Sequence, residues 1–217
     1  MNFGLSFSFI FKDEAWFKKL ILPGLCLLIP FIGWMVVLGW ALRIGQNVIS
    51  GEEHPLPDLQ FGDDLLKGFF IFLIGFVYSI PANILTTLSG WIGRWQFFNM
   101  EYGNLISVIF AGGIGLLAFL LGLLTSFLAL AAIANYAAKG DLGAAFRLNE
   151  VFDLLKANFG GWLVVALGTV LAVGIIGPLG TLACIIGVIL TLAYGMAVMG
   201  HLIGQAYQAS QEKQVVS

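Results

Sequence analysis

The chain has 217 residues, of which 59% are hydrophobic and only 10% are charged. Its mean hydropathy is +0.97. Soluble domains average about 45–50% apolar and about 25% charged residues, so composition all but excludes a soluble enzyme, a disordered chain and a disulfide scaffold. The net charge of −2 implies no basic surface for nucleic acid, and we expect no nucleic-acid partner. Cys26 and Cys184 both lie in apolar runs, where we expect small buried side chains rather than a disulfide or a metal pair.

Four charge-free runs organise the chain, at residues 20–42, 68–93, 105–138 and 159–199. A bilayer core of about 30 Å requires about 20 helical residues per crossing. The last run has 41 residues, enough for two helices, and Gly177, Pro178 and Gly180 mark the turn between them. The runs after residue 67 therefore predict four main transmembrane helices in an all-α, polytopic membrane bundle.

The first run has two interpretations. As one straight crossing it gives five spans and divides the basic residues 4 against 6, which favours no orientation. A reversal near Pro30 and Gly33 instead makes a hairpin and leaves Arg94 alone opposite the other nine Lys and Arg. Because basic residues gather in cytoplasmic loops, we predict the hairpin, with both termini cytoplasmic. Its arms hold only 10 to 12 apolar residues each, so the hairpin either crosses fully or re-enters the membrane.

These features predict a single membrane domain over residues 1–217. Its parts in chain order are an interfacial segment with the hairpin (1–50), an acidic cytoplasmic loop (51–67), two spans (68–138), a second cytoplasmic loop (139–158), a C-terminal hairpin (159–205) and a tail (206–217).

An internal repeat supports this layout. The pattern D-L-L-K-x-x-F occurs at residues 64–70 and again at 153–159, at the start of the first and the penultimate main span. Two crossings separate the copies, so they would face the same way, as in a parallel repeat. A second similarity joins residues 43–46 and 202–205, which share Ile-Gly-Gln. The alternative is chance re-use of residues suited to the membrane interface.

The stretch 135–146, Asn-Tyr-Ala-Ala-Lys-Gly-Asp-Leu-Gly-Ala-Ala-Phe, leads into Glu150 and the second repeat copy. It resembles the hallmark of a prokaryotic membrane family called domain of unknown function 4013. Residues 16–20 and the loop with Gly51-Glu52 and residues 55–58 are similar too, although residues 59–61 stand where the family usually has a Trp. The resemblance implies a multi-pass bacterial or archaeal protein and brings no known activity, cofactor or catalytic residue.

The densest polar cluster lies in the first cytoplasmic loop and comprises Glu52, Glu53, His54, Asp58, Asp63 and Asp64. Carboxylates beside a His could hold a divalent cation. A solvated acidic loop, shaped by Pro55 and Pro57, explains the cluster equally simply and is our prediction. We predict no catalytic, cofactor-binding or metal-binding residue. His201 is expected near the end of the last helix, where it would interact with the helix dipole.

Small residues recur every four positions in two spans. They are Ala118, Gly122 and Ser126 in one, and Ala183, Gly187, Thr191 and Gly195 in the other. Such stripes let helix backbones approach closely in membranes. Gly200 and Gly204 add a GxxxG pattern. An aromatic belt of Trp91, Trp95, Phe97, Phe98 and Tyr102 is expected on the outer side.

Two function classes remain after this survey. The first is a non-enzymatic membrane protein, an accessory or scaffold subunit that packs on other integral membrane subunits or lipids through its small-residue helix faces. The second is a small-solute permease or lipid-handling protein, which the repeat and the hairpin would suit. No charged residue lies at mid-depth in the four main spans, which disfavours an ion-coupled transporter. We expect the first class, in a prokaryotic inner membrane.

Overall fold

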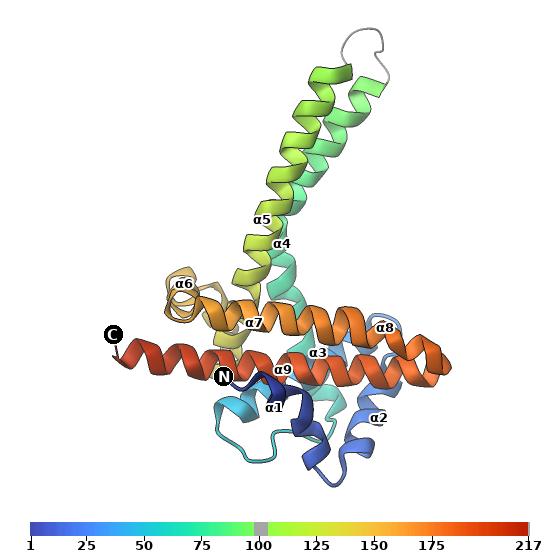
Figure 1. Ribbon diagram of the computed structural model, residues 1–217, viewed down its shortest axis with the longest axis vertical. Coiled ribbons are helices and arrows are strands. Elements are labelled where there is room, and N and C mark those ends of the chain that lie inside the picture. The colour runs from blue at the N-terminus through green and yellow to red at the C-terminus, as the bar shows by residue number, and fades with distance from the viewer. Residues whose placement is uncertain (98–103, 217) are drawn as a thin grey trace. The chain divides into compact units, whose positions relative to one another are not determined.

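In the computed structural model, which describes residues 1–97 and 104–216, every regular element is a helix, as predicted (Figure 1). The side chains of residues 93, 95–97, 104–108, 183–186 and 216 are not described. In chain order the elements are α1 (Phe3–Ser8), η1 (Phe9–Lys12), α2 (Trp16–Cys26), α3 (Ile32–Ile49), α4 (Phe61–Phe97), α5 (Asn104–Lys139), η2 (Leu142–Phe146), α6 (Leu148–Ala157), α7 (Phe159–Thr169), the π-helix η3 (Val170–Ile176), α8 (Gly177–Leu179), η4 (Gly180–Ala183) and α9 (Cys184–Val216).

Five helical stretches of the described chain are long and apolar enough to cross a bilayer. They are Ile32–Ile49, Phe61–Ile92, Ile109–Lys139, Phe159–Leu182 and Gly187–Val215. The last four correspond to the predicted main spans, and the first is α3, the second arm of the predicted hairpin. The chain is therefore a membrane protein by the length and composition of its helices.

The first apolar run is not one straight helix, because α2 ends at Cys26 and α3 begins at Ile32. Phe31 has φ +62° and ψ −59°, and Pro30 O accepts a hydrogen bond from Ile32 N–H at 2.7 Å, which together form a tight γ-turn. A Cβ at Gly33 would collide with the Cys26 carbonyl oxygen, so only Gly permits this reversal. The two arms are unequal, since α2 has 11 residues and α3 has 18.

The described chain divides into two compact units. Unit 1 comprises residues 1–74 and 130–217, and unit 2 comprises residues 75–129. Helices α4 and α5 each contribute to both units. The division is based on contacts between backbone positions. It does not test whether the whole chain forms one membrane domain, which stays a prediction.

In unit 1, helix α3 packs backbone to backbone against α9. A Cβ at Gly200 would collide with the Ala41 carbonyl oxygen, and one at Gly204 would lie 2.7 Å from Gly45 O. The Ile-Gly-Gln segments that the sequence repeats thus meet each other at this crossing. Around the crossing, the interior of unit 1 contains large side chains with under 2% exposure, among them Trp40, Ile44, Trp162, Leu154 and Leu202.

The first turns of α4 pack equally closely on α3 within unit 1. A Cβ at Gly39 would collide with Asp64 O, and a Cβ at Gly68 would collide with Met35 O. Glycine on both helices therefore brings the two backbones into contact, as in the small-residue crossings of membrane proteins.

Helices α7 and α9 form the C-terminal hairpin. The π-helix η3 continues α7, and a Cβ at Gly195 would lie 2.6 Å from Ala172 O in η3. Of the predicted turn residues, Gly177 and Pro178 lie in α8, and Gly180 begins η4, where the chain reverses. Pro178 occupies the first turn of α8, where a missing N–H is tolerated.

Unit 2 is the paired middle of α4 and α5. Ala118 is buried, a Cβ at Gly122 would touch the Ala82 methyl at 3.7 Å, and Ser89 Oγ donates to Ala111 O at 2.8 Å. Its sequence has two charged residues, Arg94 and Glu101. Its described surface exposes many large apolar side chains, among them Ile84, Trp91, Ile109, Phe110, Leu116, Leu117, Phe119, Leu120 and Leu124.

The glycine crossing of α3 and α9 gives a stability prediction. Gly200→Ala should lower the free energy of unfolding in detergent by about 1–3 kcal/mol, because the new methyl overpacks the crossing. Gly160→Ala is the matched control, since a Cβ there meets nothing within 4 Å. Denaturant titration followed by circular dichroism measures both variants. Equal stability of the two would contradict the close α3–α9 contact.

Candidate functional site

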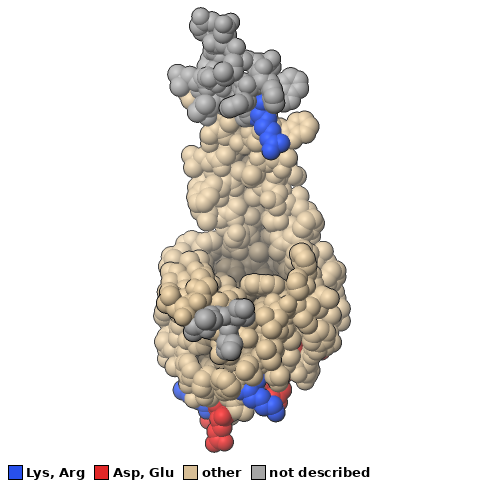
Figure 2. Space-filling view, turned by 90° about the vertical axis from the view of Figure 1, so that its right-hand side faces the viewer, with Lys and Arg blue, Asp and Glu red and all other residues tan. Residues whose placement is uncertain are grey.

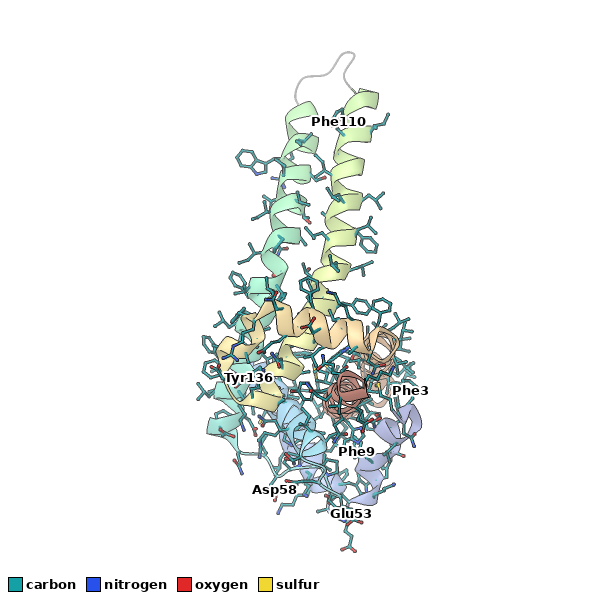
Figure 3. The ribbon with its side chains drawn as sticks, turned by 90° about the vertical axis from the view of Figure 1, so that its left-hand side faces the viewer. Phe3, Phe9, Glu53, Asp58, Phe110 and Tyr136 are labelled. Carbon is teal, nitrogen blue, oxygen red and sulfur yellow. The ribbon has the colours of Figure 1, made fainter. Side chains whose placement is uncertain are left out.

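Most charged side chains of unit 1 that are in view in Figure 2 gather at one end of that unit. This end contains the loop between α3 and α4, on which Figure 3 labels Glu53 and Asp58. Three helix side chains donate to carbonyl groups of the loop. Lys19 Nζ donates to Leu56 O at 2.8 Å, Trp40 Nε1 to Pro57 O at 3.0 Å and Asn47 Nδ2 to Pro55 O at 3.0 Å. The Pro-Leu-Pro-Asp segment is therefore fixed on unit 1 rather than free in solvent.

Asp64, counted with the acidic loop in the sequence, is instead fully buried and paired with Arg43. Arg43 Nε donates to Asp64 Oδ1 at 2.6 Å, and its terminal nitrogen donates to Oδ2 at 2.7 Å. Gln60 N–H adds a third donor to this carboxylate at 2.7 Å. The pair sits beside the Gly39–Gly68 contact, where the close α3–α4 approach excludes water. Its role is to hold the two helices in register.

The remaining acids of that cluster do not converge. Asp63 pairs with Lys67 at 2.8 Å on the surface of α4, and Glu52, Glu53 and His54 are exposed. Within residues 1–97 and 104–216, no three His, Cys, Asp or Glu side chains come close enough to hold a metal ion.

Residues 135–150 form a second polar centre, at the α5–α6 junction. Gly140, with φ +67°, ends α5, and Asp141 caps η2 by accepting from Gly143 N–H at 3.0 Å. Asn135 Nδ2 donates to Ala144 O at 2.9 Å and to Glu150 Oε2 at 2.7 Å. The residues that carry the family resemblance therefore build a folded turn.

Glu150 receives the charges of this junction. Lys139 Nζ lies 2.6 Å from Glu150 Oε2, and Arg147 lies 3.5 Å from Oε1. The hydrogen bond from Lys139, then that from Asn135, lowers the pKa of Glu150 from 4.5 to about 2. A cleft of about 540 Å³ opens beside it, with Asp153, Lys156 and Gln211 in its wall.

The sequence predicted His201 near the end of the last helix, and the structure places it within that helix. Helix α9 continues to Val216, and His201 is 4% exposed within unit 1. Its ring stacks on Phe9 with 4.2 Å between centroids, and its Nδ1 lies 3.0 Å from both Ser6 Oγ and Gln205 Nε2. The N-terminal segment, with Phe3 and Phe9 labelled in Figure 3, thus folds onto α9.

Hydrogen bonds hold Nδ1 of His201 and leave Nε2 without a described partner. Asn2 N–H can only donate, and it lies 2.6 Å from Gln205 Oε1, so the other amide atom of Gln205 is the NH₂. The two N–H groups of that amide face three acceptors, which are Asn2 O at 3.2 Å, Ser6 Oγ at 3.1 Å and His201 Nδ1 at 3.0 Å. These contacts fit either tautomer of the ring, because Ser6 Oγ can also accept from Nδ1–H.

His201 lines a pocket of about 410 Å³ beside the N-terminal segment, which we call the His201 pocket. Its walls come from α1 and η1, from the end of α3 and the loop after it, and from α9. The lining residues are Met1, Asn2, Leu5, Phe9, Lys12, Val48, Gly51, Glu52, Glu53, Pro55, His201, Gln205, Gln208, Ala209 and Glu212. The pocket combines a polar floor, an apolar side and a charged rim.

The family model for "Protein of unknown function (DUF4013)" matches residues 22–186. The chain belongs to this family. The match includes both loops described above and ends before His201, so the α9 wall of the His201 pocket lies outside it. Comparison with curated proteins and with solved structures gave no match.

The two copies of the D-L-L-K repeat of this DUF4013 protein differ in structure. In the first copy Asp64 is buried within α4, which continues into the span. In the second copy Asp153 is exposed on α6, which ends before α7 at Asn158, φ −145°. The Asp that the two copies share therefore has different roles. Asp64 forms a buried ion pair, and Asp153 lies in the wall of a cleft.

The predicted small-residue positions make contacts inside the chain. Thr191 Oγ1 donates to Gly177 O at 2.7 Å, and Gly187 O faces Gly180. Ser126 is exposed and bonds within its own helix. The side chain of Ala183 lies outside the described residues, as do those of Trp95, Phe97, Phe98 and Tyr102. Sequence analysis missed Arg43, Gln205 and Glu150, whose partners are distant in sequence.

The buried Arg43–Asp64 pair yields a mutational prediction. Asp64→Asn leaves the guanidinium buried without a counter-charge and should cost about 3–5 kcal/mol of unfolding free energy. Adding Arg43→Met should recover much of that loss. Asp63→Asn, which breaks the exposed pair with Lys67, should change stability by less than about 1 kcal/mol. Denaturant titration in detergent compares the four proteins, and equal losses for Asp63→Asn and Asp64→Asn would refute the role of the pair.

Glu150 predicts a pH dependence. A carboxyl group whose pKa is lowered by folding stabilises the protein above its unfolded pKa and loses that effect as pH falls. Glu150→Gln should therefore be less stable than the parent at pH 7, and the difference should vanish as pH falls from about 4.5 towards 2. Thermal unfolding in detergent at several pH values tests this, with the exposed Asp153→Asn as control. A difference in stability between Glu150→Gln and the parent that does not change with pH would exclude the Lys139–Glu150 bond as its cause.

Proposed function

We propose that this DUF4013 protein is a non-enzymatic, multi-pass subunit of a prokaryotic inner membrane, with both termini cytoplasmic, that packs on partner membrane proteins. One observation carries the proposal, the surface of unit 2. Its large apolar side chains are exposed on both helices of the pair, and only lipid or another protein can cover them.

The glycines of the two units support a partner more than lipid alone. In unit 1 the glycines at helix crossings face neighbouring backbones, so those small-residue faces are occupied. In unit 2 a Cβ at Gly75, Gly90, Gly112 or Gly113 would meet nothing within 4 Å. Small residues that no helix of the chain covers offer a second helix a place for close approach.

The alternative, a small-solute permease or lipid-handling protein, has the His201 pocket in its favour. A pocket of about 410 Å³ is within the size range of small-molecule sites, and its apolar side suits a molecule with a hydrocarbon part. The two proposals predict different molecules bound to the purified chain, which are a partner protein for the first and a solute or lipid for the second.

Site-directed photo-crosslinking tests the partner. A photo-reactive amino acid replaces Ile109, Leu116, Leu120 or Ile84 on unit 2, with Leu163 on α7 as an exposed control in unit 1. We expect one or two unit 2 positions to crosslink to the same protein, which also appears in fixed stoichiometry by native mass spectrometry. Gly113→Trp should reduce that adduct several-fold without loss of folding. Lipid adducts alone at every position, with a monomer or homodimer by mass, would favour the alternative.

A further inference from the structure

Two polar groups on the floor of the His201 pocket have no described partner. His201 is 4% exposed and its Nδ1 contacts Ser6 and Gln205, so Nε2 is its remaining polar atom. No described residue bonds to Nε2, and His201 lines this pocket. Gln208 donates through Nε2 to Val48 O at 2.7 Å, which leaves its Oε1 as an acceptor. Polar atoms that face a pocket can form hydrogen bonds with a ligand there.

The rim of the pocket is acidic. Glu52, Glu53 and Glu212 line it and form no ion pair with other described residues, whereas Lys12 is the one Lys or Arg in the lining. Three carboxylates against one ammonium favour a cation at the rim. An anion alone would meet repulsion from these carboxylates.

The apolar part of the lining is formed by Leu5, Phe9, Val48 and Pro55. The N-terminal segment that supplies Leu5 and Phe9 exposes further aromatic side chains, Phe3, Phe11, Trp16 and Phe17. Aromatic side chains prefer the headgroup region of a bilayer. The pocket therefore adjoins a surface suited to the membrane interface.

We propose that the His201 pocket binds a primary ammonium compound that also carries an anionic or neutral oxygen acceptor, the chemistry of a phosphoethanolamine headgroup. The ammonium group binds at the acidic rim, to which Glu52, Glu53 and Glu212 each contribute a carboxylate. With the ring proton of His201 on Nε2, the oxygen accepts from that N–H and lies towards Lys12. The same chemistry has two sources, a bilayer lipid with this headgroup or a soluble phosphoamine, and the experiment separates them. The inference is independent of the partner proposed for unit 2.

Histidine NMR of the full chain tests the proposal directly. His54→Gln leaves His201 as the single histidine, because the chain has two. The ¹⁵N-labelled protein is placed in nanodiscs of phosphatidylcholine, of phosphatidylcholine with phosphatidylethanolamine, or of phosphatidylcholine with phosphatidylglycerol. Free phosphoethanolamine is titrated into the first. We expect the Nε2 resonance of His201 to shift with phosphatidylethanolamine, with phosphoethanolamine, or with both, and not with phosphatidylglycerol. A response to the lipid alone identifies the bilayer as source, and a response to the free compound alone identifies a soluble ligand.

Variants separate binding from general effects on the fold. Glu52→Gln with Glu53→Gln should raise the concentration for half-maximal shift about tenfold, since each lost contact with a charged group weakens binding several-fold. Glu14→Gln, an exposed acid outside the lining, is the matched control and should bind like the parent. Ala209→Trp fills the pocket without a change of charge and should abolish the response. An unmoved resonance in every arm, an equal response to phosphatidylglycerol, or unaltered binding by the double Glu variant would overturn the proposal.

Discussion

The architecture of unit 1 depends on how closely other backbones approach α3. Within a bilayer, apolar side chains gain little by leaving lipid for protein, so helices associate through close packing and hydrogen bonds. Helix α3 meets α4 at Gly39 and Gly68 and meets α9 at Gly45, Gly200 and Gly204. These two contacts use different parts of α3, so one helix fixes the positions of two others. A methyl group at Gly200 would push α9 away and would move everything attached to α9.

The polar features follow from the same contacts. The Arg43 side chain reaches Asp64 because Gly39 and Gly68 let α3 and α4 approach, and the resulting pair is shielded from water. Gln208 reaches the carbonyl of Val48 at the end of α3 because α9 crosses α3 just before it. The His201 pocket therefore lies where it does as a consequence of a glycine crossing. Gln205 and Gln208 are held by backbone groups of Asn2 and Val48, and His201 is held by the side chains of Ser6 and Gln205.

The sequence predicted those properties that depend on local pattern. Charge-free runs predicted the four main spans. Pro30 and Gly33 predicted the reversal, because a γ-turn and a position that has room only for Gly depend on neighbouring residues of the chain. Of the residues predicted for the second reversal, Gly177 and Pro178 lie in α8 and only Gly180 lies in η4, because the π-helix η3 and then α8 continue α7 before the chain turns. Residues 135–146 were identified as a family hallmark, yet their folded turn depends on Glu150, several residues further on.

What the sequence could not predict were pairings across long separations. Asp64 was grouped with exposed acids because it is close to them in the chain. The residues around Asp64 in the sequence do not indicate that it pairs with Arg43 on the neighbouring helix α3. His201 was assigned to a helix end because the charge-free run ends at residue 199. Helix α9 instead continues through a partly polar sequence to Val216. Its buried state arises from Phe9 and Ser6, which are almost 200 positions earlier.

The two units differ in how their glycines are used, and this difference bears on function. Glycines such as Gly45 and Gly204 of unit 1 are in contact with other backbones of the same chain, so a further helix has no room there. Gly90 and Gly113 of unit 2 face open space on helices that expose large apolar side chains at neighbouring turns. A glycine in a helix interior that packs against nothing lowers helix propensity by about 1 kcal/mol without a compensating contact. In lipid alone such residues bring no benefit to the fold, whereas a partner helix would turn each of them into a point of close contact. The close backbone contacts of unit 1 and the uncovered glycines of unit 2 therefore support the proposal that a partner protein would bind unit 2 rather than unit 1.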